Sequence, residues 1–126
     1  MGAPGEAIKN LQRALLGKRF VQAHIKSDLA DLRGIYRDDI AYAAAIRAIA
    51  RQIVRVSFDP NRHGSPCTHR LDGCRRTKFP LDGGTEPELR LVYRVEHTML
   101  RVIAFGHRHD PASVYFQAHQ HLEQAP

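Results

Sequence analysis

Residues 89–105 read LRLVYRVEHTMLRVIAF. In the first half of this stretch the residue types alternate with a period of two, which is typical of a β-strand. One side of that strand would carry Leu89, Leu91, Tyr93 and Val95, and the other side would carry Arg90, Val92, Arg94 and Glu96. Residues 97–98 suit a hairpin turn, and residues 99–105 are a nearly continuous apolar run, as expected of a strand covered on both faces. The stretch therefore predicts a pair of β-strands.

The segments on either side of this hairpin extend the pattern. Residues 75–81 predict a third strand, which Pro80 ends because proline cannot donate to a strand ladder. Residues 82–88 and residues 60–74 predict loops, since both are rich in proline and glycine. After the hairpin, residues 111–122 predict a short terminal helix.

The clearest helix pattern covers the residues from about 39 to 58. Its apolar positions step by four and three residues, which gives one buried stripe: Tyr42, Ile46, Ile49, Ile53 and Val56. Asp38 or Asp39 is expected to start this helix, and Asp59-Pro60 to end it. Arg47, Arg51 and Arg55 step by four along another side. Two interpretations of these arginines stay open: a solvated face that keeps the protein soluble, or a docking face for an acidic partner.

The residues before this helix predict three further elements. Residues 6–16 have helical spacing and end at Gly17. Residues 19–26, RFVQAHIK, alternate loosely and predict a strand. Ser27 resembles the N-cap of a helix that has Asp28 in its first turn.

Together these elements predict an α+β fold, in which a small, mainly antiparallel sheet carries two helices on one face. We expect residues 1–18 to form an N-terminal helical extension, residues 19–122 the domain, and residues 123–126 a frayed tail. The apolar stripe of the extension must be buried, either against the domain or against a second copy in a homodimer.

Composition limits the classes of protein to which the chain can belong. Its 126 residues suffice for one domain, and 43% hydrophobic residues suffice for one core. No apolar run approaches the length of a membrane span, and the N-terminus lacks the pattern of a secretory signal, so we expect a cytoplasmic protein. The net charge of +6 favours an anionic partner such as nucleic acid or an acidic protein. Cys67 and Cys74 are expected to be reduced thiols.

The C-terminal third resembles the RelE/ParE superfamily, the toxins of type II toxin–antitoxin modules. The resemblance rests on Arg90-Leu91-Val92-Tyr93, on the hydrophobic strand that ends at Phe105, on Gly106-His107-Arg108 and on Val114-Tyr115. It covers about residues 69–116, and by element order it extends to residues 19–60. The gap between Gly106 and Tyr115 is one residue longer than the family pattern, and Arg76 stands where a lysine is usual.

The RelE branch implies an endoribonuclease that cuts mRNA in the ribosome without a metal or other cofactor. Carried over residue by residue, the resemblance implies that the catalytic set is Lys78, Arg90, Arg108 and Tyr115, and that Arg76, His107 and His109 bind substrate. Arg90 and Arg108 would hold the scissile phosphate, and Lys78 would act as the base. Tyr115 would stack on a nucleobase or orient the nucleophile. Independently of the family, Arg76 and Lys78 are two residues apart, so on a strand they share a face.

Three alternatives remain open. A ParE-like toxin would inhibit DNA gyrase without cutting RNA, and its fold would be the same. A basic module could bind nucleic acid without catalysis. Finally, His63, Cys67, His69 and Cys74 resemble a metal cluster, with His119 and His121 near the C-terminus, but neither spacing matches the common zinc patterns, so we expect no metal. Either toxin reading implies an acidic or amphipathic antitoxin as partner.

Overall fold

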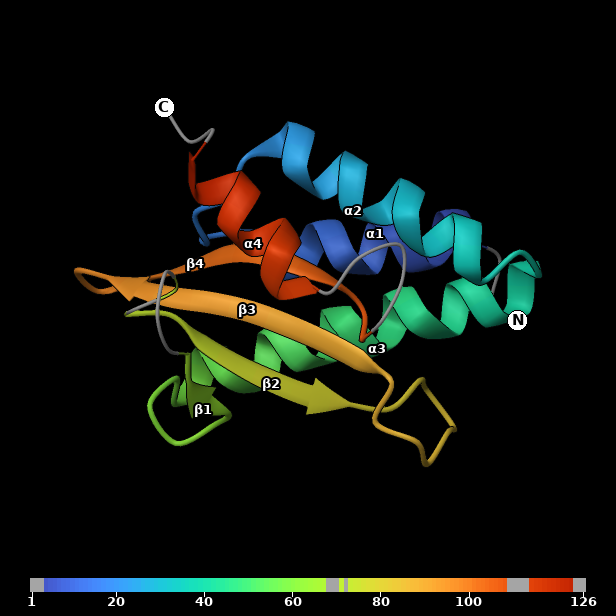
Figure 1. Cartoon of the computed structure of the whole chain (residues 1–126). Helices are drawn as coiled ribbons and strands as arrows, with labels where there is room; N and C mark the ends of the chain where they lie inside the picture. Colours follow the sequence, from blue (N-terminus) through green and yellow to red (C-terminus); the bar gives the residue numbers. More distant parts are fainter. Residues whose placement is uncertain (1–3, 68–70, 72, 109–113, 124–126) are drawn as a thin grey trace.

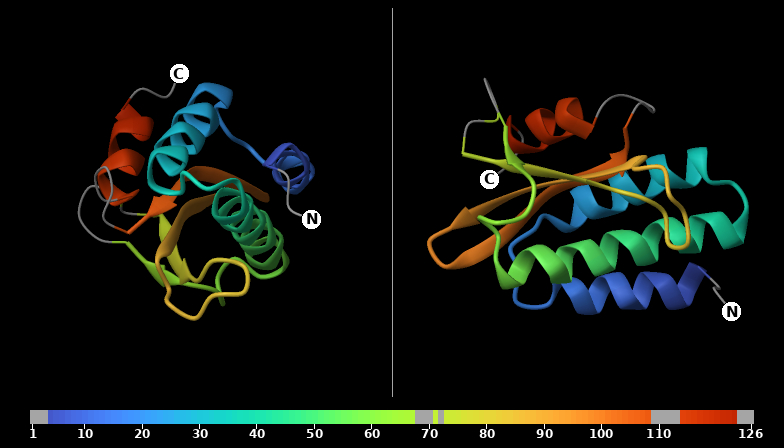
Figure 2. Two further views of the ribbon diagram at one scale, coloured as in Figure 1. Left: turned by 90° about the vertical axis from the view of Figure 1, so that its right-hand side faces the viewer. Right: turned by 90° about the horizontal axis from the view of Figure 1, so that it is seen from below.

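The computed structural model describes residues 4–67, 71, 73–108 and 114–123. Over these residues the chain forms, in order, α1 (Pro4–Leu15), α2 (Gln22–Ile35), α3 (Asp39–Phe58), β1 (Ser65–Pro66), β2 (Arg75–Phe79), β3 (Leu89–Glu96), β4 (Met99–His107) and α4 (Val114–Glu123). The strands form one antiparallel sheet in the order β1-β2-β3-β4. Helices α2 and α3 pack on one face, α1 packs on α3, and α4 covers part of the other face (Figures 1 and 2). The predicted α+β class, with its N-terminal helical extension, is confirmed.

The β3–β4 hairpin has the predicted pairing. Leu91 pairs with Phe105 across the two strands, and His97 lies in the turn with a φ of 59°. Leu91 and Tyr93 are buried in the core beneath α1, α2 and α3, whereas Val92 is buried in a second core beneath α4. The alternation in the sequence therefore assigns successive residues of β3 to two separate cores.

Helix α3 begins and ends where the sequence predicts. The carboxylate of Asp38 accepts a hydrogen bond of 3.1 Å from the backbone N–H of Ala41, so Asp38 is a true N-cap. The helix ends at Phe58, directly before Asp59. All five residues of the predicted apolar stripe are buried: Tyr42, Ile46, Ile49, Ile53 and Val56.

The strand predicted over residues 19–26 is wrong beyond its first residue. Arg19 alone pairs, through an isolated parallel bridge to Arg101 at the outer edge of β4. The N–H of Arg19 donates to the carbonyl of Leu100, and the N–H of Val102 donates to the carbonyl of Arg19, both at 2.9 Å. The chain thus passes along the edge of β4 as predicted, but it makes one bridge there instead of a strand.

Helix α2 begins at Gln22, so the predicted start at Ser27 is also wrong. Its N-cap is Val21, which makes no side-chain capping bond. Ile25 and Leu32 are buried at helical spacing, and this packing stabilises a helix that starts before Ser27. Asp28 does not serve a helix start, because its side chain is directed to partners far away in the sequence.

The N-terminal extension packs on the domain itself. Ala7, Leu11, Ala14 and Leu15 of α1 are buried in the core shared with α3. The two helices lie side by side along most of α1 (Figure 2). The sequence left open whether this apolar stripe packs on the domain or on a second copy, and in the structure it packs on the domain.

A single buried carboxylate joins β4 to α2 and α4. Asp28, which is 1% exposed, accepts a hydrogen bond of 3.1 Å from the N–H of Phe105 at the outer edge of β4. It also accepts a hydrogen bond from Gln117 and lies 2.9 Å from Nε2 of His121, both on α4. The ring of His24 stacks on His121 with the ring centroids 4.0 Å apart. These five residues, which we call the Asp28 cluster, fix α4 and α2 to the edge of the sheet.

Length and apolar character decide whether a helix could span a membrane. The 20-residue α3 carries Asp39 and three arginines. Within the described ranges of the chain, no helix has both the length and the apolar character needed to cross a bilayer.

We predict that Asp28→Ala lowers the free energy of unfolding by about 3 kcal/mol, because buried donors on β4 and α4 lose their acceptor and each costs about 1–3 kcal/mol. Urea denaturation measures this loss. Asp31→Ala, one turn along the same helix and half-buried, is the matched control, and it should change stability by less than about 0.5 kcal/mol. Equal losses in the two variants would contradict the role given to Asp28.

We also predict that acid weakens the Asp28 cluster. Burial lowers the pKa of His24, and the neighbouring His121 lowers it further. The folded state favours the neutral imidazole, so the unfolded chain binds more protons below the ordinary pKa of about 6.5. The free energy of unfolding should therefore fall as the pH decreases through and below about 6.5. His24→Phe should show a smaller fall in urea titrations, while His97→Asn, in the hairpin turn, should behave like the wild type.

Candidate functional site

Two basic residues of β2 lie on the sheet face that α4 partly covers. Between them, Thr77 is buried, and its hydroxyl accepts a hydrogen bond of 2.6 Å from Gln52 of α3. Because side chains alternate along a strand, Arg76 and Lys78 project from the opposite face. The guanidinium of Arg76 lies 5.6 Å from the ring centroid of Tyr115 on α4, which agrees with this assignment. Arg76 and Lys78 therefore share a face, as their spacing predicts.

Arg90 adds a third cation to this face. It is the direct cross-strand partner of Lys78 on one side and of Gly106 on the other. Like charges in directly opposite positions destabilise a sheet, because their Cβ atoms are only about 5 Å apart. Lys78 is exposed, and in the described part of the chain no carboxylate pairs with it. We call Arg76, Lys78 and Arg90 the basic sheet face.

Tyr115 reaches the basic sheet face from the first turn of α4. That turn passes close over β4, since a methyl group on Gly106 would lie 3.3 Å from a methyl carbon of Val114. A larger residue at this position would push the helix away from the sheet. Glycine at position 106, the cross-strand neighbour of Arg90, thus lets α4 hold Tyr115 beside Arg76.

Arg108 lies at the end of β4 and contacts the segment that leads into β3. Its N–H donates to the carbonyl of Glu88 at 2.9 Å, and its guanidinium lies 3.9 Å from the carboxylate of Glu86. The guanidinium of Arg90 donates to the carbonyl of Pro87 in the same segment. Arg90 and Arg108 therefore converge on residues 86–88, although Arg108 is not itself part of the row that contains Lys78.

The structure separates His107 from the basic sheet face. His107 pairs with Leu89, whose side chain is buried toward the helices α1 to α3. Its ring makes an edge contact with Tyr36 at the end of α2, with 6.2 Å between centroids. Burial raises the pKa of Tyr36, and so does its hydrogen bond to Glu88. His109, the other histidine predicted to bind substrate, lies outside the described residues.

The cysteines are buried free thiols. The N–H of Cys67 donates to the carbonyl of Cys74 at 2.9 Å, which closes the loop between them. Burial raises the pKa of both thiols, so neither has the character of an activated nucleophile.

The described residues also bear on the metal alternative. Among them, no three histidine, cysteine or acidic side chains are grouped so as to hold a metal ion. His69, which the sequence placed in the cluster with both cysteines, lies outside the described residues. At the C-terminus, His119 lies 3.4 Å from Glu123, and His121 belongs to the Asp28 cluster.

Two sets of residues near the site have no signal in the sequence. Glu86 and Glu88 engage Arg108 and Tyr36, but nothing in the spacing of these residues marks them as partners. The Asp28 cluster joins residues more than 70 positions apart, so no periodicity reveals it. The pattern Ser27-Asp28 predicts that Asp28 serves the start of a helix, whereas in the structure Asp28 is the centre of the Asp28 cluster.

The basic sheet face combines guanidinium and ammonium groups with one aromatic ring on an accessible surface, and this combination suits phosphate and an unstacked nucleobase. Comparisons with known proteins found no relative: no family model, no curated protein and no solved structure matches the chain.

Proposed function

We propose that the basic sheet face binds single-stranded RNA and cleaves it without a metal ion, so that the protein acts as a toxin of the RelE/ParE type that stops translation. The observation that carries this proposal is the direct pairing of Lys78 with Arg90, beside Arg76 and Tyr115. Two like charges held opposite each other cost stability, and a bound phosphate removes that cost. An aromatic ring at the same face gives an unstacked base a surface on which to stack.

Cleavage by the RNA's own 2′-hydroxyl needs a base, positive charge on the phosphorane, and an acid for the leaving 5′-oxygen. In this proposal Arg90 holds the phosphate, and the exposed Lys78, in its uncharged amine form, takes the proton of the hydroxyl and becomes an ammonium ion. Arg108 joins Arg90 by exchanging Glu86 for the phosphate; this exchange is easy because the Glu86 side chain is 73% exposed. Arg108 then stabilises the negative charge on the leaving 5′-oxygen, and solvent donates the proton to it.

The same proposal includes the partners and the location. The substrate is mRNA, met in the ribosome in the cytoplasm, and the reaction needs no cofactor. An acidic antitoxin protein would hold the toxin inactive until it is degraded. These elements rest on the resemblance of residues 89–115 to the RelE/ParE toxins and on the charge of the chain.

A second function is favoured by one observation. The guanidinium of Arg90 is engaged with the backbone carbonyls of Pro87, just before β3, and of Leu89, the first residue of β3, and His107, a histidine expected to bind substrate, lies on the other side of the sheet. Among the described residues this face has cations but no nearby histidine, and such a face suits binding better than proton transfer. The alternative is therefore a module that binds nucleic acid or DNA gyrase and cuts nothing.

We predict that Lys78→Ala and Arg90→Ala each weaken binding of a labelled single-stranded RNA, equally for different sequences, and lower the salt slope of binding by about one. Fluorescence anisotropy over a range of salt concentrations measures both quantities. Lys78→Arg, which keeps the charge, should bind normally but lose at least about 100-fold in cleavage of an mRNA transcript in the presence of EDTA. Arg37→Ala, an exposed arginine outside this face, is the control.

These measurements separate the candidate functions. Cleavage that survives in Lys78→Arg would show that Lys78 is not the base. Binding without any cleavage, with and without ribosomes, would support the non-catalytic module. If the wild-type protein neither binds nor cuts RNA, the nuclease function is rejected and inhibition of DNA gyrase remains. A supercoiling assay tests that function.

We further predict that induced expression in a bacterial host arrests growth and creates new mRNA 5′-ends, and that Arg108→Ala loses both effects because one phosphate contact is missing. Growth curves and mapping of 5′-ends provide the readout, with immunoblots to show equal protein levels. Arrest without new ends would favour gyrase as the target, and the absence of arrest would count against a toxin.

A further inference from the structure

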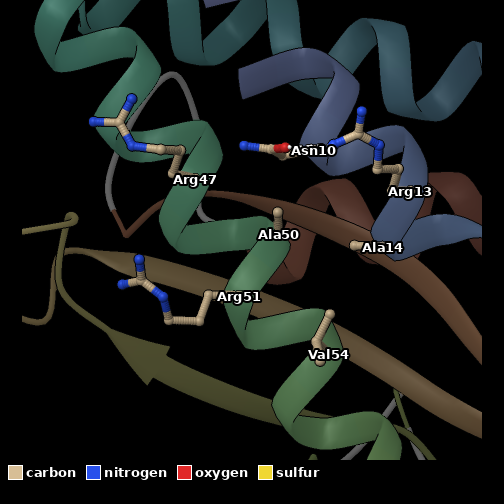
Figure 3. A pocket seen from close by; sticks show the side chains of 7 residues that line it. All are labelled: Asn10, Arg13, Ala14, Arg47, Ala50, Arg51 and Val54. Carbon is tan, nitrogen blue, oxygen red and sulfur yellow. Dashed lines mark hydrogen bonds between the residues drawn. The ribbon is translucent and has the colours of Figure 1, made fainter. Parts of the chain in front are cut away.

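A shallow groove lies between α1 and α3, away from the basic sheet face. It has a volume of about 350 Å³ and is lined by Asn10, Arg13 and Ala14 of α1 and by Arg47, Ala50, Arg51 and Val54 of α3. Figure 3 shows these side chains, with the alanines and Val54 between the two helices. Small residues at Ala14 and Ala50 leave the space open, because neither side chain extends past its own helix.

Arginines flank this apolar strip on both sides. Arg13 extends from α1, whereas Arg47 and Arg51 extend from the side of α3 that faces away from α1 (Figure 3). Asp82, in the loop after β2, holds both α3 arginines, at 3.2 Å from Arg47 and 2.5 Å from Arg51. The hydrogen bond from Arg51 lowers the pKa of Asp82, against the effect of burial, so the carboxylate stays ionised. One carboxylate orients two arginines, and the three arginines around the groove leave it with a net positive charge.

The apolar strip continues along α3 beyond the groove. Val54 is 41% exposed, and Phe58, one turn further on, is 84% exposed. From Ala50 to Phe58 the strip spans about two helical turns, or about 12 Å. A small anion would use the arginines but not this apolar surface. Exposed apolar side chains rimmed by charge are instead typical of a surface that binds another protein.

We propose that the α1–α3 groove binds an acidic amphipathic helix of a partner protein. The apolar side of that helix would lie on the strip formed by Ala50, Val54 and Phe58, and its carboxylates would pair with Arg13 on one flank and with Arg51 on the other. This is the helix-in-groove mode of recognition, in which apolar anchors provide affinity and charges set orientation.

The position of the groove favours a protein over RNA. Helix α3 lies on one face of the sheet, while Arg76, Lys78 and Arg90 project from the other. Between the arginines the strip is aliphatic, and the residues that line the groove include no aromatic ring; the ring of Phe58 lies beyond the groove, one turn past Val54. The proposal therefore does not depend on whether the basic sheet face cleaves RNA.

The test uses the full chain and a labelled synthetic peptide, about five helical turns long, with leucines on one side and glutamates on both flanks. Fluorescence anisotropy should show binding that weakens as salt rises, and about tenfold weaker binding by Arg13→Glu and by Arg51→Glu. Arg13 has no bond to Asp82 and therefore tests the groove without disturbing that loop. Arg37→Glu changes the net charge equally and should bind the peptide like the wild type.

Two further arms decide between occupants. A peptide with lysines in place of the glutamates should not bind, and a labelled single-stranded RNA should bind both groove variants as it binds the wild type. No binding of the acidic peptide, or binding that neither arginine variant weakens, would overturn the proposal. Loss of RNA binding in the groove variants, with peptide binding intact, would overturn it in favour of a nucleic-acid surface. Failure of RNA cleavage alone would leave these results unaffected.

Discussion

The arrangement of β4, α2 and α4 depends on the hydrogen bonds that the carboxylate of Asp28 makes. Strand β4 has β3 on one side only, so its other edge presents backbone groups that must find partners. Arg19 satisfies that edge near Leu100 and Val102, and Asp28 satisfies it at Phe105. Since the same carboxylate also binds α4, the end of the sheet, helix α2 and helix α4 are positioned together. Together with the burial of Val114 and Ala118 against the sheet, this contact holds α4 where Tyr115 lies beside Arg76.

The sheet then divides the chain chemically. One face is mainly apolar and rests on α2 and α3, with Thr77 as a buried polar residue, while the other is apolar beneath α4 and carries the basic sheet face. The period of two makes this division possible, because Thr77 can bond to α3 while its neighbours Arg76 and Lys78 point away. A face of this kind is built by the same alternation that builds the core, so the candidate site and the fold arise from one pattern.

Local patterns in the sequence were sufficient for much of this. The stripe of α3, its cap at Asp38 and the alternation of β3 are decided by neighbours a few residues away, and all were predicted correctly. The predictions over residues 19–28 failed because tertiary contacts decide there: Ser27-Asp28 has the form of a helix cap, yet Asp28 serves partners more than 70 residues away. For the same reason the sequence placed Arg76 and Lys78 on one face but could not link Arg108 to Glu86.

Charge alone does not tell which arginines are available to a partner. At one end of the hairpin, Glu96 pairs with Arg19, Arg94 and Arg101, so these cations are used within the fold. At the other end, Lys78 and Arg90 are direct cross-strand partners, and among the described residues neither pairs with a carboxylate; Arg90 donates only to the backbone carbonyls of Pro87 and Leu89. The contacts therefore distinguish cations that pair with carboxylates within the fold from cations whose mutual repulsion a bound anion would reduce. That distinction, and not the net charge of +6, supports an anionic ligand at the basic sheet face.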